Sequence, residues 1–332
     1  MESNGSQQVF FQHIKALLPA HLSLVDEVAE VLNISNDSAY RRIRGEKPIG
    51  MEEIKKLCIH YNISLDQFMH LNSDSVLFTG KLANRTNFSF ELYLENFLQQ
   101  IQTVNSFQEK EMYYWSKDAP VFYYYQFPEL AAFKFFFWMR TVLEYPEYSK
   151  TKFNFSDFDE NLWPLAKKIH ETYLQIPATE IWNKDNINAY LQQIEYYKDT
   201  NVFNSKSDIQ ILYDCLERMV SYIETQAEAG YKSNNNSKAI KDVPIRMYVN
   251  ELIIGDNTAM AVLNKKPVVF LNHSFINITG TKDPVFCEYM FDFFQTLIRK
   301  STLVSSVSEK QRSSFFTPIR EKLERSKKRA LN

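Results

Sequence analysis

The chain contains little glycine, little cysteine and almost no net charge. Only 7 of its 332 residues are glycine, which argues against the glycine-built loops that bind phosphate groups in nucleotide-dependent enzymes. The three cysteines, Cys58, Cys215 and Cys287, are far apart and each falls on an apolar helical face, so we expect buried free thiols in a reducing compartment. Because the formal net charge is −2, contact with a polyanion has to come from a local basic patch.

Long apolar segments are also lacking. The first residues read M-E-S-N-G-S-Q-Q, without the basic start and apolar run of a secretory signal. The most apolar window, Leu130 to Leu143, is interrupted by Lys134 and Arg140 and is too short to span a bilayer. We therefore expect a cytoplasmic protein with no membrane partner.

Motifs of known enzyme classes are missing as well. The sequence has no P-loop, no G-x-S-x-G and no G-x-G-x-x-G motif, and its six histidines do not pair with other ligands at metal-binding spacing. His273, Ser274 and Asp283 bring base, nucleophile and acid types together, but their order matches no known triad, and surface residues are the simpler interpretation. The sequence therefore predicts no enzyme, no catalytic residue, no metal and no cofactor.

The most informative segment runs from Val28 to Gly45 and reads V-A-E-V-L-N-I-S-N-D-S-A-Y-R-R-I-R-G. Apolar residues at helical spacing predict a helix that ends near Asn33, a residue type that tolerates the left-handed backbone of a tight corner. Ser35 or Asn36 then caps a second, short helix, which Gly45 ends. Two helices joined in this way are how many proteins place a helix in the major groove of DNA.

The second of these helices has an apolar inner face and a basic outer face. Ala39 and Ile43 lie four residues apart and are expected to face the core. On or near the outside we expect arginines that suit phosphate and guanine contacts, with polar residues and a tyrosine nearest the base edges. Residues 1–70 hold seven Lys/Arg against nine Asp/Glu, but basic side chains concentrate at this helix. The candidate DNA-binding residues are Asn36, Ser38, Tyr40, Arg41, Arg42, Arg44 and Lys47.

Flanking segments complete a small helical domain. Val9 to Leu18 and Met51 to Tyr61 have helical periodicity, and a last short helix is capped at Ser64. The first 72 residues are therefore expected to form a five-helix, helix-turn-helix domain for DNA binding.

This domain resembles that of Cro and the phage repressors, through V-A-E-V-L-N-I-S and I-S-L-D-Q-F. It is still more similar to the BetR-type helix-turn-helix regulators of bacteria, through N-D-S-A-Y-R-R-I-R-G-E. The resemblance covers residues 1–70. It departs from the family at Asn33, where glycine is usual, and at Tyr40-Arg41-Arg42, where small polar residues are common. It implies a transcriptional regulator that binds double-stranded DNA as a homodimer on two half-sites.

Beyond this domain the sequence predicts a mainly α fold with one small α+β module. Amphipathic helices recur from Phe88 to Thr225, which gives a helical, aromatic-rich region for dimerisation or sensing over 76–230. Residues 232–238 read as a linker, and the periodicity then changes from 3.6 to 2. We expect a module over 240–332, with a three-stranded antiparallel meander and two helices laid on it. The strands of this meander are expected at 245–254, 258–263 and 267–271.

Two features beyond the first domain bear on function. Residues 298–332 carry ten Lys/Arg and three Asp/Glu, for which a solvated terminal helix is favoured over added phosphate contacts. The aromatic clusters of the middle region are first of all core, and they also suit a pocket for a small-molecule or protein effector. The favoured function is a DNA-binding regulator. The alternative is a helical protein-interaction or scaffolding adaptor without specific DNA binding.

Overall fold

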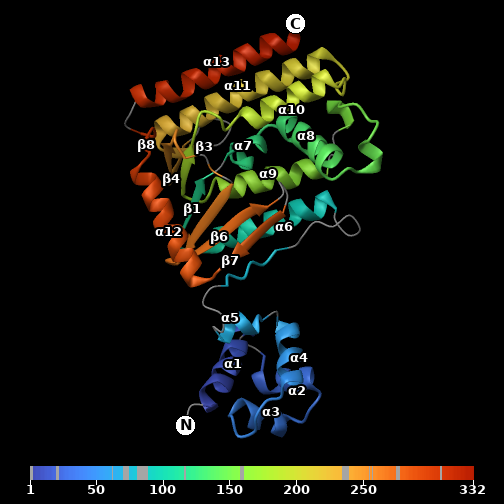
Figure 1. Cartoon of the computed structure of the whole chain (residues 1–332), viewed down its shortest axis with the longest axis vertical. Coiled ribbons are helices and arrows are strands. Elements are labelled where there is room, and N and C mark those ends of the chain that lie inside the picture. The colour runs from blue at the N-terminus through green and yellow to red at the C-terminus, as the bar shows by residue number, and fades with distance from the viewer. Residues whose placement is uncertain are drawn as a thin grey trace. The chain divides into compact units, whose positions relative to one another are not determined.

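Two units divide the chain, Met1–Leu77 and Phe78–Asn332, and each is described by itself. The computed structural model (Figure 1) describes residues 3–19, 22–61, 63–69, 75–80, 89–115, 117–157, 161–233, 239–253, 255, 257–273, 277–306 and 309–332. Among these residues, no helix combines the length and the apolar character needed to cross a lipid bilayer.

The described part of the first unit contains five helices, in the order that the periodicity predicts. They are α1 (Ser3–Leu17), α2 (Leu24–Leu32), α3 (Asn36–Ile43), α4 (Met51–Tyr61) and α5 (Leu65–Met69). Their apolar faces meet in one core, in which Phe11, Ile14, Val28, Ala39 and Leu57 are fully buried. Because these residues come from four different helices, the core fixes the helices to one another.

The second unit is built on a sheet that mixes parallel and antiparallel pairing (Figure 1). Its strands are β1 (Lys110–Trp115), β2 (Ala178–Trp182), β3 (Tyr231–Ser233), β4 (Ala239–Val249), β5 (Thr258–Leu263), β6 (Lys266–His273), β7 (Asn277–Thr281) and β8 (Thr302–Leu303). Strand β1 is parallel to β2, which is parallel to β4, whereas β1 is antiparallel to β5. The order across the sheet is β3-β4-β2-β1-β5-β6-β7, and β8 pairs with β4.

Helices cover both faces of this sheet. They are α6 (Phe90–Ser106), α7 (Val121–Tyr124), α8 (Pro128–Phe137), the π-helical η1 (Trp138–Val142), the 3-10 turns η2 (Pro146–Tyr148) and η3 (Phe155–Asp157), α9 (Leu162–Tyr173), α10 (Asn188–Asp199), α11 (Lys206–Ala229), α12 (Pro284–Arg299) and α13 (Glu309–Leu331). Alternate residues of a strand point to opposite faces, so Met112 packs with α6 and α9 while Tyr113 packs with α12. Helices α10, α11 and α13 pack together in a further layer (Figure 1).

A charged network is buried beside the sheet. The Glu180 side chain of β2 is fully buried, and its carboxylate accepts hydrogen bonds from the hydroxyls of Tyr123 (2.9 Å) and Tyr173 and from the indole N–H of Trp182 (2.7 Å). Lys232 of β3 is also fully buried, and its Nζ donates to the Tyr173 carbonyl at 2.7 Å. Because the partners come from α7, α9, β2 and β3, this network ties four elements together.

The predicted antiparallel meander is wrong. Strands β5 and β6 do form the expected hairpin, with Val262 opposite Pro267. However, β4 does not lie beside β5: it pairs in parallel with β2, and β5 pairs with β1. Local periodicity indicates that a segment is a strand, but it carries no information on a parallel partner far away in the sequence.

The predicted separation of regions 76–230 and 240–332 also differs from the structure. Strands from both regions belong to one sheet, and both regions fall within the second unit. Part of the predicted 232–238 linker is strand β3, in which Lys232 and Ser233 are buried; residues 234–238 lie outside the described residues. The two described residues of this segment, Lys232 and Ser233, therefore belong to a buried polar network rather than to a solvated connection.

Candidate nucleic-acid interface

The corner between α2 and α3 has the geometry that its sequence predicts. Asn33 ends α2 in the left-handed region, with φ 55° and ψ 54°. Ser35 caps α3 by accepting a hydrogen bond from the backbone N–H of Ser38 at 3.3 Å. Gly45, with φ 78°, follows the end of α3. A left-handed residue and a side-chain cap set the angle at which α3 leaves the corner, and this fixes the direction of its outer face.

The inner face of α3 is anchored in the core of the first unit. Ala39 is fully buried, and Ile34 and Ile43 are half-buried against the same apolar cluster. The small Ala39 side chain allows α2 and α3 to pack closely, in line with the contacts between these two helices. Burial of this face leaves the opposite face of α3 for solvent.

Arg42 does not lie on the outer face, and that expectation is wrong. It is 6% exposed, and its Nε and Nη2 donate to the two carboxylate oxygens of Glu53 on α4 at 3.0 and 2.8 Å. Its Nη1 donates to the carbonyl of Ser38 at 3.0 Å. Hydrogen bonding from Arg42 holds the pKa of the Glu53 carboxyl below its ordinary value. With its donors engaged inside the unit, Arg42 fastens α3 to α4 and is not available to bind DNA.

Tyr40, Arg41, Arg44 and Lys47 lie on the exposed side of α3 and of the loop after it. The Tyr40 side chain is 47% exposed, and the Arg44 guanidinium lies 5.4 Å from the centre of its ring. Arg44 also donates to the Tyr40 hydroxyl at 3.2 Å and pairs with Glu46 at 3.4 Å. Among the described residues, the side chains of Arg41 and Lys47 make no hydrogen bond or ion pair. These four residues form an outer face that carries three positive charges.

Asn36 and Ser38 begin α3 and are partly engaged with their surroundings. Asn36 is exposed, and its Nδ2 donates to the Asp26 carboxylate of α2 at 2.8 Å. Ser38 is half-buried, and its hydroxyl accepts a hydrogen bond from the Ser35 hydroxyl at 3.1 Å. Both side chains therefore contribute to the corner itself, and Asn36 is exposed beside it.

Two glutamines of α1 support the loop after α3, and the sequence analysis missed both. The Gln7 amide donates to the carbonyls of Arg42 (2.7 Å) and Lys47 (2.8 Å) and accepts from the Ile49 N–H (3.1 Å). The Gln8 amide donates to the Arg44 carbonyl at 2.9 Å. Gln7 precedes Phe11 and Ile14 at the i, i+4, i+7 spacing of one helix face, and this spacing is the signal that could have identified it.

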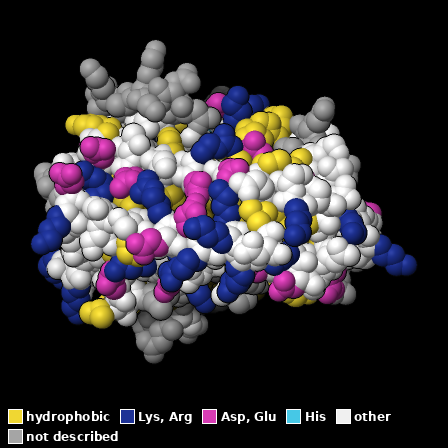
Figure 2. Space-filling model, turned by 90° about the horizontal axis from the view of Figure 1, so that it is seen from above, with side chains coloured by type: hydrophobic (Ala, Val, Ile, Leu, Met, Phe, Trp, Pro, Cys, Tyr) yellow, Lys and Arg dark blue, Asp and Glu magenta, His cyan; other side chains and the backbone are white. Residues whose placement is uncertain are grey.

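The basic C-terminal helix α13 is not a free cationic surface. Figure 2 shows Lys and Arg side chains interspersed with Asp and Glu side chains on the face seen there. Lys322 pairs with Asp185 at 2.9 Å, Lys327 with Asp214 at 2.7 Å and Arg320 with Glu224 at 2.5 Å. Arg329 also pairs with Glu195. Acidic residues outside 298–332 thus pair with much of the positive charge of α13, while Phe315, Phe316, Ile319 and Leu323 bury its inner face in the core of the second unit.

Of the remaining candidate residues, Asp283 and the three cysteines fall within the described part of the chain. Asp283 caps α12 by accepting from the Phe286 N–H at 2.8 Å. The side chain of His273 and all of Ser274 lie outside the described residues. No group of three or more His, Cys, Asp and Glu residues that could hold a metal occurs among the residues searched. The three cysteines are free, as predicted, with Cys215 and Cys287 buried and Cys58 half-buried.

Comparison of the chain with protein-family models, with curated proteins and with solved structures gives no match. The candidate interface therefore has to be judged on its own residues and geometry.

Proposed function

We propose that the chain is a cytoplasmic, sequence-specific DNA-binding transcriptional regulator that reads DNA with α3. One observation carries this proposal: α3 is fixed on its inner side by Ala39 and by the Arg42–Glu53 pair, and it keeps Tyr40, Arg41 and Arg44 exposed on its outer side. A short helix held rigidly and presenting basic side chains suits insertion into the major groove.

The roles of the outer residues follow from their chemistry. Arg41 can form the paired hydrogen bonds that guanine O6 and N7 accept, or it can bind a phosphate. Arg44 and Lys47 flank the end of α3 and suit the phosphate backbone, whereas Tyr40 and Asn36 suit base edges. A single helix of eight residues reaches few bases, so we expect a homodimer that engages two half-sites about 34 Å apart.

Selection of bound fragments from sheared genomic DNA, followed by fluorescence anisotropy with the selected fragment, tests this proposal. The Arg41→Ala/Arg44→Ala variant should bind at least about ten-fold more weakly and with a shallower salt dependence, because fewer counterions are released. The matched control is Lys55→Ala/Lys56→Ala, which removes two exposed cations from α4 and should change affinity less than about two-fold.

Two results would contradict DNA reading by α3. If no fragment is selected, the protein-interaction adaptor is the better description of this chain. If the parent binds a fragment but the α3 and α4 variants bind it equally well, the DNA contact lies elsewhere.

A further inference from the structure

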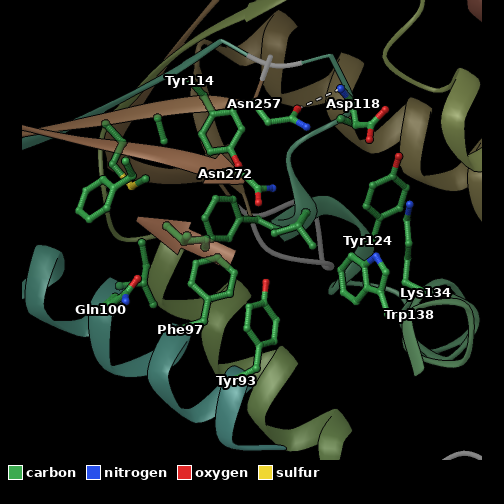
Figure 3. A pocket seen from close by; sticks show the side chains of 18 of the residues that line it. Tyr93, Phe97, Gln100, Tyr114, Asp118, Tyr124, Lys134, Trp138, Asn257 and Asn272 are labelled. Atoms are coloured by element: carbon green, nitrogen blue, oxygen red, sulfur yellow. Dashed lines mark hydrogen bonds between the residues drawn. The ribbon is translucent and has the colours of Figure 1, made fainter. Parts of the chain in front are cut away.

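The second unit contains a cavity that is separate from the candidate nucleic-acid interface. It lies between α6 and the sheet, and has a volume of about 120 Å³ (Figure 3). Phe97 and Ile101 line it from α6, and Met112, Phe270 and Ile278 line it from three strands. An apolar cavity of about 150 Å³ can hold one benzene ring. The body of this cavity therefore has the apolar lining and the room for a ligand of about one ring.

One end of the cavity carries a buried cation. Lys134 of α8 is 5% exposed, and its ammonium lies 5.0 and 4.9 Å from the ring centres of Tyr124 and Tyr190. Desolvation lowers the pKa of Lys134 to about 8, so its side chain still carries a charge at neutral pH. Within the described part of the chain its hydrogen-bond acceptor is the Gln193 side chain, at 3.0 Å. An ammonium has three N–H donors, so Lys134 can also donate to a ligand.

A carboxylate lines the cavity together with this cation. Asp118 belongs to the segment between β1 and α7, and its backbone N–H donates to the Asn257 side chain at 3.4 Å (Figure 3). Lys134 and Asp118 attract each other, and this attraction opposes the cost of burying either charge. The described lining holds no other Lys, Arg, His, Asp or Glu side chain, so its formal net charge is zero.

A lining of this kind disfavours charged ligands. A ligand carboxylate would be attracted by Lys134 but repelled by Asp118, and a ligand ammonium would meet the reverse. Either one would lose its hydration without an excess of opposite charge to replace it. A hydroxyl can accept from an ammonium and donate to a carboxylate at once, and a carboxylate has about four lone-pair sites for such donors. The charge pair therefore complements an uncharged group that is both donor and acceptor.

We propose that this cavity binds a small uncharged molecule that consists of one aromatic ring and a short arm with a hydroxyl group. The ring packs among Phe97, Met112 and Phe270, and the hydroxyl accepts a hydrogen bond from Lys134 and donates one to Asp118. A few convergent polar groups in an otherwise apolar, aromatic-lined space are what small-molecule sites use to fix the orientation of a ligand. Because all of these residues belong to the second unit, the inference does not depend on DNA binding.

Calorimetric titration of the full chain with four compounds that share a ring and a one-carbon arm tests the preference for an uncharged head group. The compounds are benzyl alcohol, toluene, benzoate and benzylamine. Benzyl alcohol should bind at least about three-fold more tightly than toluene, because toluene makes no hydrogen bond. It should bind at least about ten-fold more tightly than benzoate or benzylamine, whose charges the neutral lining does not balance. If benzyl alcohol does not bind, or if any of the other three equals or exceeds it, the proposal is overturned.

Variants that unbalance the charge pair test the location of the site. Asp118→Asn leaves Lys134 as the charge of the described lining and should bind benzoate at least about ten-fold more tightly than the parent does. Lys134→Met leaves Asp118 instead and should bring a gain of the same size for benzylamine. Lys134→Met should also weaken benzyl alcohol at least about three-fold, because a hydrogen-bond donor is lost.

Two kinds of control accompany these variants. Lys168→Met and Glu171→Gln change exposed residues of α9 in the same way and should leave all four affinities within about two-fold of the parent. Ala259→Leu adds volume to the lining from β5 and should weaken benzyl alcohol and toluene alike. Unchanged head-group preferences in folded Asp118→Asn and Lys134→Met protein would place the ligand outside this cavity and overturn the proposal.

Discussion

The two units bury charge in different ways. In the first unit the buried Arg42 bonds with Glu53, which is only eleven residues away along the chain and partly exposed. In the second unit Glu180 and Lys232 are both fully buried, and each has a hydrogen-bond partner that is distant in sequence: the Tyr123 hydroxyl lies 57 residues from Glu180, and the Tyr173 carbonyl lies 59 residues from Lys232. A charge that is paired locally and near the surface costs little to bury, whereas deeply buried charges depend on complete partners. Removal of one hydrogen-bond partner should therefore lower the stability of the second unit more than that of the first unit.

The largest effect is expected from Glu180→Ala. This change leaves the Tyr123 hydroxyl and the Trp182 N–H without their acceptor and leaves Lys232 without a nearby opposite charge, which should destabilise the second unit by about 3–5 kcal/mol. The chain's four tryptophans all lie in this unit, so denaturant unfolding followed by tryptophan fluorescence reports on it alone. An unchanged midpoint would show that the network contributes little to stability.

The second largest effect should be a dependence of the stability of the second unit on pH. Burial lowers the pKa of His170 from 6.5 to about 4, so the folded protein holds this side chain neutral. Above pH 6.5 His170 is neutral in both the folded and the unfolded chain, so the folded state keeps its full stability. As the pH falls from 6.5 toward 4, His170 takes up a proton in the unfolded chain but not in the folded one, and the free energy of unfolding decreases. The loss should be about 3 kcal/mol between pH 7 and pH 4.

Other groups titrate in the same range, so the effect of His170 has to be isolated. We compare the parent with His170→Gln by tryptophan-monitored unfolding at several pH values. The parent should lose more stability than the variant on acidification from pH 7. Parallel pH profiles for the two proteins would mean that His170 is protonated as easily when folded as when unfolded.

A smaller effect is expected in the first unit from Arg42→Ala. Loss of the Arg42–Glu53 pair should destabilise this unit by about 1–2 kcal/mol, less than a fully buried pair because Glu53 is partly exposed. Since the first unit has no tryptophan, unfolding is followed by far-ultraviolet circular dichroism beside the fluorescence signal. The double variant Arg42→Ala/Glu53→Ala should cost less than the sum of the two single changes, and strict additivity would contradict a direct coupling.

The smallest effect concerns the corner at Asn33. Because this residue has φ 55°, Asn33→Ala should cost about 1 kcal/mol, whereas Asn33→Gly should stay within about 0.5 kcal/mol of the parent. Thermal unfolding of the three proteins by circular dichroism measures the difference. If alanine and glycine behave alike, the left-handed backbone at the corner is not what limits the residue type there.

The features that the sequence predicts well are those set by neighbouring residues. The left-handed Asn33, the Ser35 cap, the positive φ of Gly45 and the β5–β6 hairpin all depend on contacts within a few residues. The prediction that Arg42 lies on the outer face of α3 is wrong. Arg42 lies three residues from the buried Ala39 and so shares its side of the helix. Its acceptors on Glu53 belong to the next helix and cannot be read from α3 alone.

The features that could not be predicted depend on distant partners. Nothing near Lys134 indicates that it lies against rings of α7 and α10, and nothing near Lys232 indicates Glu180. The parallel pairing of β2 with β1 and β4 could not be predicted for the same reason, because a crossover connection leaves no local signature in the sequence of a strand. The candidate DNA-binding face was therefore largely accessible from the sequence, whereas the buried partners of Lys134 and Lys232 were not.

The central position of β1 has a consequence for synthesis of the chain. Its two neighbours are β2, which ends at Trp182, and β5, which ends at Leu263, so one edge of β1 lacks its partner until most of the polypeptide has left the ribosome. During that interval the Met112–Trp115 segment presents an open backbone edge and large apolar side chains, the combination that promotes intermolecular pairing. Slow translation beyond Trp182 should therefore lower the yield of native protein, while the helical first unit, whose contacts are local, completes its core early.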